Sequence, residues 1–78
     1  LPLPLVERFA RSKRPNVPYA AVNAIAAHGD RSALDLLIAL HNEPPKEDLR
    51  STLFEAIEPI AGRLGVTVIR AGRRLEIA

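Results

Sequence analysis

The chain of 78 residues contains no cysteine, no methionine and no tryptophan. Without cysteine it can form neither a disulfide framework nor a thiolate metal site, so nothing in the composition indicates an oxidising compartment, and we expect a cytoplasmic protein. Apolar stretches such as residues 33–40 fall well short of the roughly 18 residues that a membrane span needs. The first residues also lack the basic and long apolar regions of a signal peptide. We therefore expect no association with a membrane.

The length and the composition predict one small globular domain. The chain is 47% hydrophobic and 26% charged, which is typical of a globular protein rather than a disordered one. A domain of this size buries roughly 60% of its unfolded surface, which excludes a large enzyme fold with a deep active site. The start at Leu1 and the absence of methionine indicate a piece of a longer protein. Arginine far outnumbers lysine and alanine is abundant, which is typical of a GC-rich, bacterial coding sequence.

Charge is unevenly distributed along the chain, although the formal net charge is only +2. Both ends are basic, whereas residues 33–61 carry an excess of acidic side chains. Three explanations are open: the ends pack on the middle, copies of the chain associate head to tail, or the ends bind an anionic partner.

Two helices are predicted in the first part of the chain. Pro4 suits a first helical position, and the apolar spacing after it predicts a helix over residues 4–13. The next helix is predicted over residues 17–28, with the side chain of Asn16 as its cap. Gly29 is expected to end this helix in a left-handed conformation.

Two further helices follow in the acidic part of the chain. Ser32 and Asp35 have the spacing of a capping box, which predicts a third helix that ends by Glu43. A fourth helix is expected to begin near Pro45, because an apolar stripe of helical period follows. Pro59 lies inside that stripe and is expected to bend the helix or to divide it in two.

A β-hairpin is predicted at the C-terminus, because the apolar period changes from 3.6 to 2 at Val66. A two-residue turn at Ala71 and Gly72 would pair Val66 with Ile77 and place the apolar residues on one face. A longer loop is the alternative, because alanine disfavours a positive φ. An isolated hairpin is marginally stable, so its apolar face must pack on the helices or on another chain. The predicted fold is mainly α, four helices closed by a C-terminal β-hairpin.

Residues 16–65 resemble HEAT-like helical repeats. The resemblance consists of an alanine-rich helix that ends in Gly29-Asp30, a second helix with the sequence SALDLLIALHNE, a turn with prolines, and a further helix that ends in RLG. It implies helix pairs that stack side by side and a role as a protein-binding scaffold. It covers about one and a half repeats, where about three are usual, and the hairpin belongs to no such repeat.

Few residues are suited to catalysis or to metal binding. His28 and His41 lie on different predicted helices, without the i, i+4 spacing of a zincin site and without a third histidine. Glu55 and Glu58 lie one helical turn apart, which fits a solvated face better than an acid and base pair, because no nucleophile accompanies them. We expect no catalytic site, no metal, no cofactor and no small-molecule substrate.

The predicted function is a non-catalytic protein-interaction or adaptor module, which could also self-associate into a homo-oligomer. A protein partner is expected on the leucine-rich helix surfaces or along the free edge of the hairpin, by strand addition. The residues predicted to bind it are Leu34, Leu37, Leu53 and Ile57.

The order of the elements also resembles a winged-helix DNA-binding domain, in which the hairpin contacts phosphate. Arg70, Arg73 and Arg74 cluster at the hairpin and are the nucleic-acid contacts under this alternative. The preceding helix begins KEDLRSTLFE, with more carboxylates than cations where a recognition helix would face DNA. A solvated arginine tip is the simpler interpretation of the same cluster.

Overall fold

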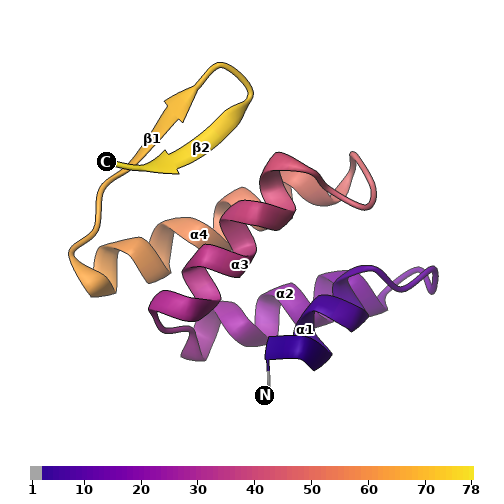
Figure 1. Cartoon of the computed structure of the whole chain (residues 1–78). Helices are drawn as coiled ribbons and strands as arrows, with labels where there is room; N and C mark the ends of the chain where they lie inside the picture. The colour runs from indigo at the N-terminus through magenta and orange to yellow at the C-terminus, as the bar shows by residue number, and fades with distance from the viewer. Residues whose placement is uncertain (1–2) are drawn as a thin grey trace.

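The computed structural model describes residues 3–78 and confirms the predicted architecture of four helices and a C-terminal antiparallel hairpin (Figure 1). Leu1, on which the expectation of a longer protein rests, lies outside the described residues. In the described part, no helix has both the length and the apolar character needed to cross a lipid bilayer. The elements are α1 Leu3–Ala10, α2 Val17–His28, α3 Arg31–Asn42, α4 Leu49–Leu64, β1 Val68–Ala71 and β2 Arg74–Ile77.

The helix caps differ from the predictions. α2 has the predicted bounds, but the side chain of Asn16 makes no capping hydrogen bond, and a proline occupies the first turn instead. α3 is capped by Asp30, whose carboxylate accepts a hydrogen bond of 3.0 Å from the Ala33 amide, so Ser32 is not the cap. Aspartate and serine are comparable caps, and the one that comes first in the chain caps this helix.

Gly29 is extended rather than left-handed, with a φ of −68°. Its small size is required for another reason. A Cβ atom at this position would lie 2.6 Å from Ile60 Cδ1 and 2.8 Å from the Ile25 carbonyl oxygen. The end of α2 therefore approaches α4 more closely than a larger residue permits.

α4 begins at Leu49 and not near Pro45, because residues 44–48 form turns. The helix continues through Pro59, so the expected alternative of two separate helices is wrong. It ends in a Schellman motif, in which Gly65 takes a φ of 68° and the Val66 amide donates to the Ala61 carbonyl at 2.9 Å.

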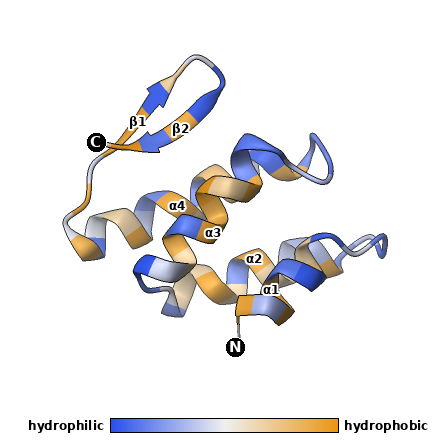
Figure 2. Cartoon of the chain, viewed as in Figure 1, coloured by the Kyte–Doolittle hydropathy of each residue, from blue (hydrophilic) through white to orange (hydrophobic). Residues whose placement is uncertain are grey.

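α4 is the central helix of the core. α2 and α3 both pack against it, α1 packs on α2, and β2 packs on α3. α2 and α3, the pair that resembles a HEAT-like unit, make their main contacts with α4 rather than with each other. Figure 2 shows apolar segments where α2, α3 and α4 meet, and hydrophilic ones in the loops from α1 to α2 and from α3 to α4.

The hairpin turn consists of Gly72 and Arg73, one residue later than predicted. Gly72 takes a φ of 67° at the first turn position, where a two-residue hairpin favours a residue without a Cβ atom. Ile77 therefore pairs with Val68 and not with Val66. The predicted register is wrong, and no cross-strand pair of Arg70 with Arg73 forms.

Candidate interaction site

The side chain of Asn42, at the end of α3, holds the hairpin on the helices. Its Oδ1 atom accepts a hydrogen bond of 2.7 Å from the Leu75 amide, and its Nδ2 atom donates one of 3.0 Å to the Leu75 carbonyl. The Leu75 side chain is buried in the core. The amide group of Asn42 thus pairs with the outward-facing main-chain groups of Leu75 in the way that a neighbouring strand would.

The opposite edge of the hairpin, on β1, is free. The main-chain groups of Leu75 face Asn42, so the pair of Arg70 with Leu75 is a non-hydrogen-bonded pair. Hydrogen-bonded and non-hydrogen-bonded pairs alternate along an antiparallel ladder, so the pair of Val68 with Ile77 is also non-hydrogen-bonded. The main-chain amides and carbonyls of Val68 and Arg70 therefore point away from β2. Within residues 3–78, no main-chain hydrogen bond from another segment reaches them.

A groove of about 300 Å³, lined by both apolar and charged residues, lies between α4 and the hairpin on the side of β1. Ile57 belongs to the lining of this groove, but its side chain is almost fully buried and lies below the surface. The charged residues of the lining are Glu58 and Arg70. The apolar lining is formed by Phe54, Ile57, Ala61, Val66, Val68 and Leu75.

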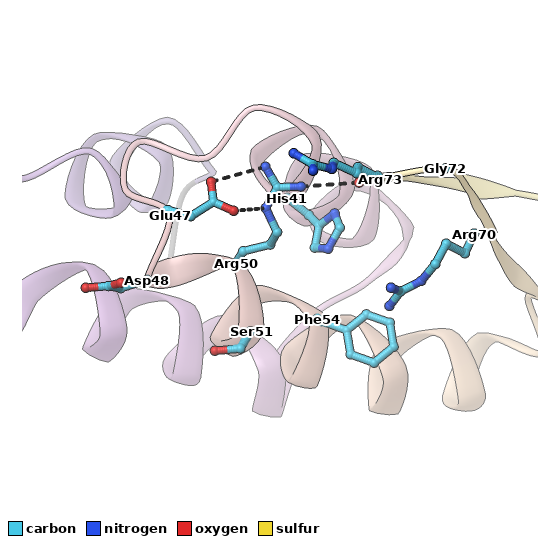
Figure 3. Close-up of a pocket in the computed structure, with 9 residues that line it drawn as sticks. All are labelled: His41, Glu47, Asp48, Arg50, Ser51, Phe54, Arg70, Gly72 and Arg73. Atoms are coloured by element: carbon cyan, nitrogen blue, oxygen red, sulfur yellow. Dashed lines mark hydrogen bonds and ion pairs between the residues drawn. The ribbon is translucent and has the colours of Figure 1, made fainter.

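A second, wider groove of about 640 Å³ lies at the hairpin turn (Figure 3). Arg50, in the first turn of α4, connects its two sides. The Arg50 Nε atom lies 3.0 Å from a carboxylate oxygen of Glu47, and an Nη atom donates to the Arg73 carbonyl at 3.2 Å. The hairpin turn is therefore tied to α4, as Asn42 ties β2 to α3.

Arg70 and Phe54 line both grooves and form their common wall. The guanidinium carbon of Arg70 lies 5.4 Å from the centre of the Phe54 ring, within the range of a cation–π interaction. Figure 3 shows the two side chains approaching each other from β1 and α4. The ion pairs within residues 3–78 join other residues, so Arg70 has no carboxylate partner there.

His41 lies buried beneath the wider groove, with 5% of its surface exposed. Its Nδ1 atom is 3.3 Å from Asn42 Oδ1, and its ring centre is 6.3 Å from that of Phe54. Burial lowers the pKa of His41 most, and the charges of Arg50 and Arg70 lower it further, against opposing effects of Asn42 and of the Glu47 carboxylate. His41 is therefore neutral at neutral pH and packs as part of the fold.

The four residues predicted to bind a partner lie in the core. The side chains of Leu34, Leu37, Leu53 and Ile57 are only 0–1% exposed. The helical stripe correctly marks them as buried, but their own domain covers them. In the folded domain a partner must therefore contact other residues.

The three arginines predicted to contact nucleic acid do not act as one cluster. Arg70 and Arg73 line the wider groove, and Arg50, which the sequence analysis did not single out, joins them there. Arg74 pairs with Ala71 and lies on the other face of the hairpin, because side chains alternate along a strand.

The residues considered for catalysis or for metal binding do not gather at one place in the structure. His28 is exposed on α2 and His41 is buried on α3. In the described range, 3–78, no three His, Asp or Glu side chains gather in a way that could hold a metal ion. Glu55 and Glu58 are exposed on α4, which confirms the prediction of a solvated face.

Comparisons of the chain with protein-family models, with curated proteins and with solved structures found no match in any of the three.

Proposed function

We propose that this domain is a non-catalytic protein-interaction module that binds an extended segment of another protein along β1. The observation that carries the proposal is the free edge of β1 beside a groove on α4 that is lined by apolar residues, Glu58 and Arg70. In strand addition, main-chain hydrogen bonds supply affinity, and pockets for alternate side chains supply specificity. β1 and its groove offer both.

The dimensions of the site support a short segment. β1 has four residues, which corresponds to about 13 Å of extended chain. A groove of about 300 Å³ has room for one or two apolar side chains of the bound segment. The hairpin is already held by Asn42 and Arg50. Little ordering of the site itself is then needed on binding, which favours affinity.

The proposal assigns this domain the role of an adaptor, and it requires no cofactor, metal or small-molecule substrate. A cytoplasmic setting is consistent with a chain that has no cysteine. In this proposal the partner binds the edge of β1 and the groove beside it, and not the buried leucines that the sequence predicts as the binding residues.

The test is a selection of seven-residue peptides from a random display library, followed by mapping of bound peptides by amide chemical shifts. We expect the shifts to concentrate on β1 and on the adjoining face of α4. The variant Val68→Pro removes an outward-facing amide from the edge while leaving the β2 ladder in place, so it should lose most of the affinity. Ile69→Thr changes the opposite face of the same strand and serves as the matched control.

Peptides that bind Val68→Pro as tightly as the parent, or that shift only residues of α1 and α2, would contradict the proposal. The spectrum of the free variant shows whether it has kept its fold. A selection that yields no peptide with detectable binding also contradicts it.

DNA binding is the second candidate, because Arg70 and Arg73 line one groove at the hairpin. Glu47 and Asp48 line the same groove, which disfavours a polyanion. This alternative predicts binding of duplex DNA that weakens steeply with salt and is lost in the variant Arg70→Ala/Arg73→Ala. No detectable binding to a random duplex at low ionic strength would remove it.

A further inference from the structure

We infer that the segment bound along β1 carries an acidic residue two positions from an apolar one, with the carboxylate on Arg70 and the apolar side chain in the groove between α4 and β1. This inference rests on the proposed function and names the chemistry of the partner.

The apolar half of the motif follows from the groove. The partly exposed apolar side chains of its lining are those of Phe54, Val66 and Val68, above the buried Ile57 and Leu75. A segment paired with β1 places alternate side chains toward this lining, where an aliphatic group loses contact with water. Glu58 also lines the groove, so a second carboxylate at this position would meet a like charge.

The acidic half follows from Arg70. Its guanidinium lies over the Phe54 ring, and the ion pairs within residues 3–78 leave it without a carboxylate partner. An arginine stacked on a ring keeps the N–H groups at its edge free to donate to a carboxylate in a bidentate pair. The stacking also holds the side chain in place, so less side-chain freedom is lost on binding.

The charges around Arg70 are mixed. Arg73 lines the wider groove and has no ion-pair partner within the described residues. Glu47 and Asp48 line the same groove, and Glu47 is paired with Arg50. A single carboxylate on Arg70 is therefore favoured over a polyanion, which would also approach Asp48.

The spacing of the motif follows from the strand. Val68 and Arg70 are two residues apart, so both side chains lie on the face of β1 that is turned toward α4. The partner residues opposite them are also two apart, at roughly 7 Å along the strand. In a segment that runs antiparallel to β1, the residue opposite Arg70 comes first, so the recognised pattern is an acidic residue, any residue, and an apolar residue.

The experiment uses four synthetic seven-residue peptides that differ only at the two motif positions, with binding measured by fluorescence anisotropy. Their cores are Glu-Thr-Val, Gln-Thr-Val, Lys-Thr-Val and Glu-Thr-Glu. We expect Glu-Thr-Val to bind most tightly, and Gln-Thr-Val to bind about tenfold more weakly because the charge-assisted hydrogen bonds are lost. Lys-Thr-Val and Glu-Thr-Glu should bind more weakly still.

Two variants assign the acid preference to the stacked arginine. Arg70→Gln should abolish the difference between the Glu-Thr-Val and Gln-Thr-Val peptides, whereas Arg74→Gln, the same change on the opposite face, should preserve it. Phe54→Leu keeps the positive charge but removes the ring, and it should reduce the difference. Thermal melting of each variant shows whether it has folded.

The outcomes separate this inference from the proposed function. Equal binding of the Glu-Thr-Val, Gln-Thr-Val and Lys-Thr-Val peptides overturns the acidic motif and leaves strand addition standing. An acid preference that persists in Arg70→Gln also overturns the motif. If none of the four peptides shifts the β1 amides at millimolar concentration, both the motif and the proposed function fail.

Discussion

At the scale of single residues, Gly29 is the position where size matters most. An alanine there would place its Cβ 2.6 Å from Ile60 Cδ1 and 2.8 Å from a main-chain oxygen. We expect Gly29→Ala to lower the free energy of unfolding by about 1–3 kcal/mol through overpacking. Gly62→Ala, inside α4 with open space around the added methyl group, should raise it by about 0.5–1 kcal/mol. Urea denaturation followed by circular dichroism measures both.

The pair of glycine variants tests whether α2 and α4 approach as closely as described. If Gly29→Ala proves as stable as the parent, the side chain of Ile60 moves aside at little cost. The close packing at the end of α2 would then not be a requirement of the fold.

His41 should make the stability of the domain depend on pH. Burial lowers the pKa of His41 below its ordinary value of 6.5, so the unfolded chain binds a proton at a pH where the folded chain does not. The free energy of unfolding is then highest above about pH 7 and falls as the pH decreases through 6.5 toward the lowered pKa. Chemical denaturation from about pH 8 to pH 5 measures this loss.

The matched substitutions His41→Gln and His28→Gln assign this pH dependence. His28 is exposed, so its replacement should leave the profile of the parent unchanged. His41→Gln should flatten the profile between about pH 7 and pH 5, because the buried titrating group is gone. An identical slope in both variants would show that carboxylates, and not His41, cause the loss.

At the scale of the elements, the contact between α3 and β2 depends on Asn42. In the variant Asn42→Ala the amide and the carbonyl of Leu75 both lose their hydrogen-bond partner, which should cost about 2 kcal/mol. Hydrogen exchange at the Leu75 amide should accelerate, and the hairpin should become more mobile than the helices. Asn23→Ala, at an exposed position of α2, is the control and should leave the exchange of Leu75 unchanged.

Unchanged protection of the Leu75 amide in Asn42→Ala would mean that packing of the Leu75 side chain alone fixes the hairpin. The outer edge of β2 would then be open to a partner as well as that of β1.

Local signals determine how well each element is predicted from the sequence. The bounds of α2 are predicted correctly because Pro15 precedes it, Pro18 occupies its first turn and Gly29 follows it. The hairpin is predicted correctly, but its register is not, because a turn shifted by one residue still leaves apolar residues at alternate positions. Gly72 in fact takes the first turn position, and Arg73 follows it.

The candidate site is harder to predict, because its contacts join distant parts of the chain. Asn42 and Leu75 are 33 residues apart, and no local pattern marks either as a partner of the other. An apolar stripe shows that residues such as Leu34 and Leu37 are buried, but it does not show whether another helix or another protein covers them. This is why the sequence predicts a partner on the buried leucines.

At the scale of the whole molecule, the charge pattern is consistent with one of the three explanations considered. The basic C-terminal end packs against the acidic middle, because Arg70 and Arg73 line the same groove as Glu47 and Asp48. The basic side chains at the start of the chain, Arg8 among them, remain exposed to solvent. Packing therefore brings the C-terminal arginines near acidic residues of the middle, although the ion pairs within residues 3–78 do not join the two groups.

A free strand edge also exposes the molecule to pairing with its own copies. Natural edges are kept short and charged to prevent this, and β1 has four residues of which Arg70 is the one charged residue. We expect Arg70→Val, which leaves an edge of apolar residues only, to dimerise through β1, so that its mass in sedimentation velocity increases with concentration. The parent should keep the mass of one chain over the same range.

Two further variants show whether such dimers use the β1 edge. Arg74→Val makes the same change on β2 and should remain monomeric, because the outer edge of β2 is occupied by Asn42. Adding Val68→Pro to Arg70→Val removes an outward amide and should restore the monomer. If Arg70→Val sediments as a single chain at every concentration, the charge of Arg70 does not protect this edge. The arginine would then serve only its contact with Phe54 and the ligand that we infer for it.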